Sequence, residues 1–375
     1  MEVREKPRSD FQYTVVGPGE YFIDEIFQGH KFPTFYTEKR LAALEFKLTD
    51  GYKDLVKTWK KVSLSLKTFE GCYWGKCYFC TYNESYLNKQ KSLSQERANI
   101  LIKTMNGINK TLTKLNSDLS VSFYFSHASI KRKNLRHMIE ALNQYKKGNY
   151  SWVSFMRPEM WVKKHLADIG ATKGIIDIGF EIISYRDVVN KGASVKEHVS
   201  LALAARENNV PVYGEFMYGI PKTDIKDMLY YLFGMCRIKH TLLCVALGQL
   251  WVEDCTYYSK NPDEFDITLY DVAPLTNYGQ TEEEEEEEED PKYKSGFAAV
   301  SGFTLKKGQR KWIGMNKKFL QAMEVVLEGK PETWEYYPDY MEKMEKSEAL
   351  KIAHTFFPKE KELSYEIADH VWSIS

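Results

Sequence analysis

Three cysteines, Cys72, Cys77 and Cys80, lie within nine residues in the segment EGCYWGKCYFC. Clustered thiols of this kind indicate metal binding or catalysis before disulfides in a reducing compartment. Three thiolates on one short loop can hold three corners of an iron–sulfur cubane and leave one iron without a protein ligand. Because clusters that only carry electrons usually have four cysteine ligands, an open iron indicates a cluster that binds a cofactor or a substrate.

A structural zinc site is the alternative use of the same cysteines. It would take Cys77 and Cys80 as a two-residue knuckle, together with Cys72 and a distant fourth ligand. Zinc sites more often pair two such knuckles, and this sequence has no second one. The spacing therefore favours iron–sulfur. A zinc-stabilised, non-catalytic scaffold stays as the alternative from a different functional class.

The elements that must position these cysteines are short apolar runs that alternate with stretches of helical spacing. We expect strands at 62–69, 121–126, 152–157, 174–181, 210–221 and 240–248. We expect helices at 94–108, 133–145, 160–170, 195–208 and 224–238. Ser92 is a possible cap for the first helix, and Gly170 closes the third.

Six strand-then-helix units with apolar strands imply an α/β fold with a parallel sheet and right-handed crossovers. A doubly wound sheet and a partial barrel both fit this pattern, and we expect a partial (β/α)6 TIM-like barrel. The cysteine loop directly follows the first strand. Because such folds build their sites at the carboxyl ends of the strands, the loop is in the position of a functional site.

The ends of the chain differ from this central part in composition. We expect a short N-terminal extension over 1–61 and the barrel over 62–270. An acidic, irregular insert follows over 271–308, and a helical C-terminal extension covers 309–375.

The charge of the chain is balanced overall, with 52 basic and 52 acidic residues. Glu282 to Asp290 is an unbroken block of nine acids, so the rest of the chain carries nine excess positive charges. A block of this kind repels itself and is usually a solvated loop. The alternatives are an acidic decoy in a basic substrate groove and a contact with a basic partner. Because the basic residues are not clustered, we expect no nucleic-acid partner.

No stretch of the sequence approaches the roughly 18–20 consecutive apolar residues of a membrane span. The first residues, MEVREKPRSD, lack the pattern of a secretory signal. We therefore expect a cytoplasmic protein without a membrane partner.

The cysteine loop resembles that of the radical S-adenosylmethionine superfamily. The two-residue spacing before Cys80 and the aromatic Phe79 match, and the resemblance assigns Phe79 to the cofactor site. The first spacing has four residues, one more than the superfamily's commonest pattern. The segment GCYWGKCYFC is similar in style to the loop of cobalamin-type radical enzymes that modify ribosomally made peptides.

The resemblance covers roughly residues 62–270 and continues through the segment from IGFE to YGIPKTD. It implies that Glu181 bonds the ribose of S-adenosylmethionine and that the Gly219–Pro221 turn flanks its adenine or ribose. Ile182 stands where relatives have a serine after that glutamate. Ser126, His127 and Ala128 stand where many have a Gly-Gly-Glu turn. His127 is either a proton-transfer residue or a plain loop histidine.

Two further sets of residues have two interpretations each. Arg157, at the end of the third strand, either meets the cofactor's carboxylate by bidentate pairing or forms a surface salt bridge. Cys236, Cys244 and Cys255 either ligate an auxiliary cluster, as in many relatives, or behave as small hydrophobic residues. The apolar runs around Cys236 and Cys244 favour the second interpretation.

The resemblance implies a radical S-adenosylmethionine enzyme with a 4Fe–4S cluster on the three cysteines. Such an enzyme generates a 5′-deoxyadenosyl radical that abstracts hydrogen from its substrate. The relatives suggest a peptide or protein side chain as substrate, docked on the helical C-terminal part, and a small reductant protein as electron donor. A cobalamin-dependent methyltransferase is the alternative within the superfamily. We expect residues 1–61 to be too short for the separate cobalamin domain such enzymes carry.

Overall fold

The computed structural model divides into two compact units, Met1–Leu55 and Val56–Ser375. In the first unit, β1 (Glu2–Arg4) pairs antiparallel with β2 (Thr14–Val16). The structure describes residues 2–4, 14–16, 50–67, 71–81, 93–126, 128–250, 252, 256–271, 301–305, 309–328, 334–336 and 340–375.

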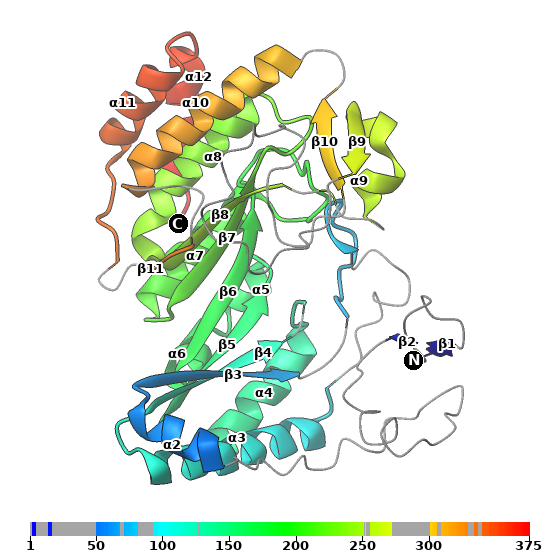
Figure 1. Cartoon of the computed structure of the whole chain (residues 1–375). Helices are drawn as coiled ribbons and strands as arrows, with labels where there is room; N and C mark the ends of the chain where they lie inside the picture. The colour runs from blue at the N-terminus through cyan, green and yellow to red at the C-terminus, as the bar shows by residue number, and fades with distance from the viewer. Residues whose placement is uncertain are drawn as a thin grey trace, which may run out of the picture. The chain divides into compact units, whose positions relative to one another are not determined.

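A seven-stranded sheet is the centre of the second unit (Figure 1). Its strands, in order across the sheet, are β3 (Lys61–Lys67), β4 (Ser120–Ser126), β5 (Tyr150–Met156), β6 (Gly174–Glu181), β7 (Val212–Tyr218), β8 (Leu242–Gln249) and β11 (Trp334–Tyr336). The first six pair in parallel, and β11 pairs antiparallel with β8. Each parallel strand lies beside the one before it, without the reversal of a doubly wound sheet. The expected partial barrel of the α/β class is therefore confirmed.

Helices follow the parallel strands as the sequence predicts. They are α3 (Gln95–Leu115), α4 (Arg132–Tyr145), α5 (Met160–Lys163), α6 (Leu166–Ala171), α7 (Val195–Glu207) and α8 (Ile225–Ile238). One further helix, α2 (Asp50–Thr58), precedes β3 and was not predicted. Two details of the prediction are wrong. The cap of α3 is Ser94, whose hydroxyl accepts a hydrogen bond from the Arg97 amide, while Ser92 lies outside the described residues. The helix expected over 160–170 breaks at His165, and α6 ends at Ala171, with Thr172 rather than Gly170 as its C-cap.

The C-terminal part is helical, as expected, and packs on α8. Its helices are α10 (Gln309–Leu327), α11 (Lys346–Phe356) and α12 (Lys361–Ser373) (Figure 1). Tyr231 of α8 contacts the ring of Phe319, and the Tyr230 hydroxyl lies 2.9 Å from Nδ1 of His370. In the described part of the chain, no helix combines the length and the apolar character that crossing a membrane demands.

A smaller set of elements follows β8. It comprises α9 (Tyr257–Lys260), η5 (Pro262–Phe265), β9 (Ile267–Asp271) and β10 (Ser301–Leu305). The 3-10 helix η4 (Lys239–Thr241) directly precedes β8. β10 pairs antiparallel with β9, so regular structure occurs within the segment that was expected to be irregular.

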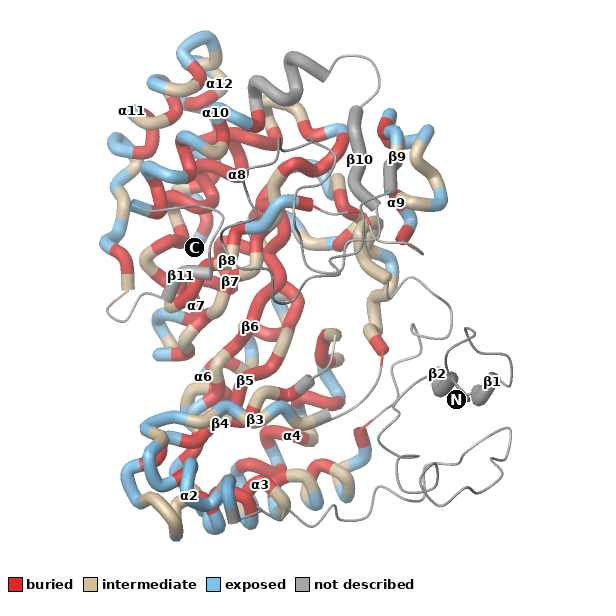
Figure 2. The backbone as a smooth tube through the Cα atoms, viewed as in Figure 1, coloured by how far each residue is buried: buried red, intermediate tan, exposed pale blue. Residues whose placement is uncertain are grey.

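The two faces of the parallel sheet differ in chemistry. Because side chains alternate along a strand, one face carries Phe123, Trp152 and Phe180, which are buried under the helices. Phe180 contacts His198 of α7, which fixes that face as the helix-covered one. Figure 2 shows how completely β6 is buried. The opposite, inner face of the half-barrel carries polar side chains, among them Ser122, Tyr124, Ser151, Asp177 and Glu215. Parallel strands are usually apolar on both faces, so this inner face is the unusual one.

Candidate functional site

The cysteine loop leaves the carboxyl end of β3, as the sequence predicts. Cys72 forms an isolated parallel bridge with Ser129, which follows the end of β4. Gly71 and Gly75 have φ angles of 77° and 58°, in the left-handed region that glycine adopts without steric cost. These two residues let the backbone curl, so that the loop lies at the carboxyl edge of the sheet.

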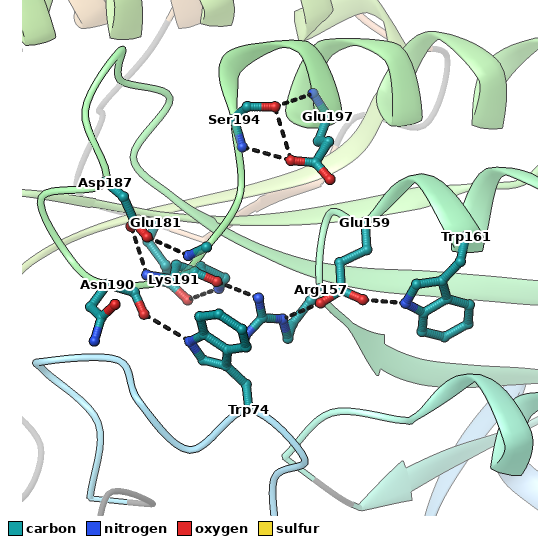
Figure 3. A network of polar contacts seen from close by, with 11 residues as sticks. Trp74, Arg157, Glu159, Trp161, Glu181, Asp187, Asn190, Lys191, Ser194 and Glu197 are labelled. Atoms are coloured by element: carbon teal, nitrogen blue, oxygen red, sulfur yellow. Dashed lines mark hydrogen bonds and ion pairs between the residues drawn. The ribbon is translucent and has the colours of Figure 1, made fainter.

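The loop is fastened to the segment that follows β6 (Figure 3). The Trp74 indole Nε1 donates a hydrogen bond to the carbonyl of Asn190 at 2.7 Å. The Asn190 side chain donates in return to the carbonyl of Lys76 at 2.9 Å. The amide of Tyr78 donates to the carbonyl of Val189 at 3.0 Å. Segments more than a hundred residues apart in sequence therefore form one structural unit.

Hydrogen bonds and close packing explain the residues of the Asn190-Lys191-Gly192 turn. The Asp187 carboxylate accepts hydrogen bonds from the amides of Lys191, at 2.7 Å, and Gly192, at 2.5 Å. Asn190 and Gly192 have φ angles of 52° and 70°. A Cβ atom on Gly192 would lie 2.5 Å from the Trp74 ring. Only glycine allows both the backbone conformation and the close approach of Trp74.

Arg157 lies beneath the loop at the end of β5 (Figure 3) and is only 3% exposed. Its guanidinium carbon is 4.1 Å from the centroid of the Trp74 ring and 5.5 Å from that of Tyr73. Its Nε donates to Glu159 at 2.9 Å, and its Nη2 donates to the carbonyl of Lys191. Its buried Nη1 has no hydrogen-bond partner among the described residues. Arg157 therefore does form an ion pair, with Glu159, but its guanidinium is buried rather than on the surface. The arginine keeps one donor, Nη1, available for an acidic ligand.

Glu181 ends β6 with a φ angle of 59°, where the register with β7 shifts. Its Oε1 accepts a hydrogen bond from Nζ of Lys191 at 2.7 Å, and both residues are buried. The pair lies over Gly179, where a Cβ atom would be 2.5 Å from Oε1 and 2.7 Å from Nζ. Lys191 supplies the polar partner that a buried carboxylate requires. Oε2 makes no hydrogen bond to a described residue, and the ribose contact stays a prediction.

Lys191 is a residue that sequence reasoning missed. The resemblance included Asn-Lys-Gly as a motif without a role for its lysine. The signal was present in the spacing, because a carboxylate that ends an apolar strand needs a nearby cation or donor.

The Cys77 thiol is strongly affected by its burial in the loop. Burial raises the pKa of Cys77 to about 12, and the charges of Lys191 and Arg157 oppose that rise. A bound metal ion would supply the positive charge that favours the thiolate. The other side of the loop is covered by aromatic rings, since Tyr78 stacks on Tyr257 at 4.8 Å and the Tyr258 amide donates to the Tyr78 carbonyl.

The donor set of the loop is three thiols. Three thiolates can each ligate one iron of a cubane, whereas a tetrahedral zinc site would need a fourth ligand. Within the residues that the structure describes, no three His, Cys, Asp or Glu side chains are placed to hold one metal ion. Three thiols on one loop, above a buried arginine, are compatible with a cluster of that kind.

The remaining residues assigned to the cofactor lie near the same edge of the sheet. Gly219 follows β7 with a φ angle of 77°, and the turn continues to Pro221. The amide of Leu250, after β8, donates to the carbonyl of Tyr218 at 2.9 Å and holds this turn in place. Phe79 is partly exposed within the cysteine loop. Their contacts with a cofactor stay predictions.

Two of the other three cysteines lie in regular elements of the fold. Cys236 is buried in α8, and Cys244 is buried in β8. Burial raises the pKa of Cys236 to about 12. Both fit the interpretation as small hydrophobic residues. Cys255, His127 and the acidic block 282–290 lie outside the described residues.

Two acids on the inner face were also missed by sequence reasoning. The Tyr124 hydroxyl donates to Oδ2 of Asp177 at 3.2 Å. Burial raises the pKa of Asp177 to about 6 and that of Glu215 to about 8. The electrostatic effect of Glu181 adds to both shifts. The available signal was an aspartate in the middle of the apolar run GIIDIGFE.

Comparisons with known proteins place this site in context. No family model matches the chain, and no curated protein matches it. Similar solved structures include the cobalamin-dependent S-adenosylmethionine radical enzyme OxsB with aqua-cobalamin bound, at 11% identity and a TM-score of 0.49. The match covers 70% of this chain and 41% of OxsB. The radical S-adenosylmethionine methyltransferase TsrM from Kitasatospora setae, with cobalamin and a 4Fe–4S cluster bound, has 9% identity and a TM-score of 0.49. That match covers 83% of this chain and 61% of TsrM.

A third solved structure, Elp3 from the archaeon Methanocaldococcus infernus, has 10% identity and a TM-score of 0.32 over 54% of this chain and 48% of that one. OxsB and TsrM carry the name of the superfamily that the cysteine loop resembles. The chain spans less than two thirds of each of these proteins. At these identities and TM-scores the matches transfer no residue role or activity, and the function of this chain rests on its own residues.

Proposed function

We propose that this chain is a radical S-adenosylmethionine enzyme with a 4Fe–4S cluster on Cys72, Cys77 and Cys80. The observation that carries the proposal is the three-thiol loop at the carboxyl end of β3, fastened by Trp74 to the turn after β6. When bound, the reduced cluster and S-adenosylmethionine would supply a radical that abstracts hydrogen from an unactivated carbon. The residues of the chain bind, orient and shield these groups.

Three groups of the chain are suited to hold S-adenosylmethionine. Nη1 of Arg157 is a buried donor that can pair with the carboxylate. Oε2 of Glu181 can accept hydrogen bonds from ribose hydroxyls, because Lys191 occupies only Oε1. The left-handed turn of Gly219–Pro221 offers backbone without a side chain beside the adenine or ribose. Phe79 lies in the loop next to Cys80 and supplies an apolar wall.

Aromatic side chains would keep water from this site. Trp74 covers Arg157, and Tyr78 packs against Tyr257 and Phe265 on the other side of the loop. Excluding water strengthens the electrostatic contacts and protects a reactive radical from side reactions. We further propose a peptide or protein side chain as substrate and a small reductant protein as electron donor, on the strength of the loop's resemblance.

Cofactor cleavage tests the proposal. The protein is purified anaerobically, reconstituted with iron and sulfide, reduced with dithionite and supplied with S-adenosylmethionine. We expect 5′-deoxyadenosine and methionine by liquid chromatography and mass spectrometry. Cys72→Ala, Cys77→Ala and Cys80→Ala should each abolish both products, whereas the core variant Cys244→Ala should keep them. If the reconstituted protein binds zinc, stays colourless and cleaves nothing, the non-catalytic scaffold is the better description.

The cobalamin-dependent methyltransferase stays the alternative within the superfamily. No contact among the described residues favours it. Titration of the purified protein with hydroxocobalamin distinguishes the two, because our proposal requires no corrin. A one-to-one complex with a shifted corrin spectrum would make methyl transfer the better hypothesis.

A further inference from the structure

The inner face of the half-barrel carries more negative than positive charge next to the candidate cofactor residues. Asp177 of β6 and Glu215 of β7 project from the same face, since Glu215 pairs in register with Gly179, two residues after Asp177. The charged groups that act on both are Glu181 and Lys191. Lys191 already pairs with Glu181, so within the part of the chain that the structure describes Asp177 and Glu215 have no cation of their own.

The hydrogen bonds of the two acids are incomplete. Asp177 is 3% exposed; its Oδ2 accepts from Tyr124 at 3.2 Å, but its buried Oδ1 has no partner among the described residues. Glu215 is half-buried and makes no hydrogen bond or ion pair to the described part of the chain. Buried polar atoms are normally bonded, and a buried carboxylate without a cation is costly. A polar or cationic group from outside the chain would complete both acids.

Burial raises the pKa of both carboxyl groups; the charge of Glu181 adds to both shifts, and the charge of Asp177 adds to that of Glu215. An apolar residue at either position would avoid this cost, and parallel strands usually carry apolar residues on both faces. The two carboxyl groups therefore either share protons or receive a positive charge from a ligand. The unpartnered Oδ1 of Asp177 is the buried atom that such a ligand would contact.

We propose that Asp177 and Glu215 bind a primary ammonium group of the substrate, with Tyr124 holding Asp177 in position. This inference rests on the proposed function and names its substrate class: a peptide that presents a lysine side chain, or a small alkylamine. Asp177 offers one oxygen, because Tyr124 occupies the other. That geometry suits an ammonium group, a compact point charge, rather than the two-pronged guanidinium of arginine.

Binding is measured by isothermal titration calorimetry on the anaerobically reconstituted full chain near neutral pH. The probes are acetyl-Gly-Lys-Gly-amide, its norleucine analogue and butylammonium chloride. The variants are Asp177→Asn and Glu215→Gln. The control is Glu140→Gln, which removes one charge from an exposed position on α4. We expect the lysine peptide or butylammonium to bind. Each inner-face variant should weaken that binding by roughly tenfold to a hundredfold, because a charge-assisted hydrogen bond is lost, and the control should not.

The probes distinguish the two sources of the ammonium group. Binding of the lysine peptide alone assigns a peptide side chain, and equally strong binding of butylammonium assigns a small amine. Two results would overturn the inference. The first is that the lysine and norleucine peptides bind equally and butylammonium does not bind. The second is that binding is unchanged in Asp177→Asn and Glu215→Gln. Thermal unfolding of each variant shows whether it is folded.

The pH dependence provides a second readout. Because a bound ammonium group displaces the proton from Glu215, affinity should rise steeply from about pH 6 to about pH 8 in the parent protein. In Glu215→Gln the rise should be much smaller, because only Asp177, with a pKa of about 6, still titrates at the lower end of this range. The other titratable groups that face the pair, Tyr124, Glu181 and Lys191, are retained in both proteins. An affinity independent of pH in the parent would contradict the inference.

Iron content and 5′-deoxyadenosine formation are measured on the same sample. Ammonium binding without a cluster would leave the ammonium site intact and reject the proposed function. A working cluster without ammonium binding would reject the ammonium site and leave the proposed function intact. The two failures are therefore distinguishable.

Discussion

The buried pair of Glu181 and Lys191 makes a quantitative prediction. Their charged atoms lie 2.7 Å apart, and their side chains are 9% and 5% exposed. Lys191→Met keeps most of the length and the apolar stem of the lysine but leaves the Glu181 carboxylate buried without a cation. Removing one partner of a buried pair costs about 3–5 kcal/mol. Since domains are stable by only about 5–15 kcal/mol, Lys191→Met should be markedly destabilised.

A double-mutant cycle separates the pair from the packing of its side chains. Glu181→Gln leaves an amide that needs no cation. In Glu181→Gln/Lys191→Met no unpaired charge remains, so the double variant should be more stable than Lys191→Met alone. We expect a coupling of about 1–3 kcal/mol between the two positions.

Urea unfolding, followed by tryptophan fluorescence under anaerobic conditions, measures these differences. S-adenosylmethionine affinity is measured on the same proteins. Glu181→Gln should keep its iron and bind the cofactor roughly tenfold to a hundredfold more weakly, because the ribose loses a charge-assisted bond. A difference of less than about 0.5 kcal/mol between the free energies of unfolding of Lys191→Met and the parent is typical of exposed surface sites. Such a small difference would refute the buried pair. Unchanged cofactor affinity in Glu181→Gln would make that carboxylate purely structural.

Three further predictions concern neighbouring positions. Gly192→Ala places a Cβ atom 2.5 Å from Trp74 at a φ angle of 70°, so it should lower the free energy of unfolding by about 2–4 kcal/mol and reduce iron content. Gly107→Ala is the matched control, because a Cβ atom there has no atom within 4 Å. It should be neutral or stabilising in the same unfolding assay. Trp74→Phe loses the bond to Asn190 and should lower the urea midpoint by an amount equivalent to about 1–2 kcal/mol, and an unchanged midpoint would contradict that bond. The raised pKa of Glu215, about 8, means that the folded chain binds more protons than the unfolded chain between about pH 5 and pH 8, so stability should fall as pH rises through this window; Glu215→Gln should flatten that fall, and an identical slope would count against the shift.

Much of the fold was predictable because its elements are defined locally. Each parallel strand is a short apolar run, and each run predicted from sequence corresponds to a strand of the sheet. The order of the strands was not predictable, because a doubly wound sheet and a barrel share the same alternation of elements. The break between α5 and α6 at His165 was missed because its apolar spacing continues across the break.

The site was predictable in part. The cysteine loop could be recognised from residue types and spacing alone. The pairing of Glu181 with Lys191 depends on a turn that Asp187 organises through two backbone amides. The meeting of Asp177 and Glu215 depends on strand register, which brings together residues that are far apart in the sequence. Long-range contacts of these kinds leave no local pattern.

The most direct test of the central claim is the iron and sulfide content of the anaerobically reconstituted protein, with its electron paramagnetic resonance spectrum after reduction. We predict about four irons per chain, lost in Cys72→Ala, Cys77→Ala and Cys80→Ala and retained in Cys244→Ala. We also predict that S-adenosylmethionine changes the spectrum of the reduced cluster, because one iron has no protein ligand. A protein that incorporates no iron, or whose iron survives the change of a loop cysteine and whose spectrum ignores S-adenosylmethionine, would contradict the claim.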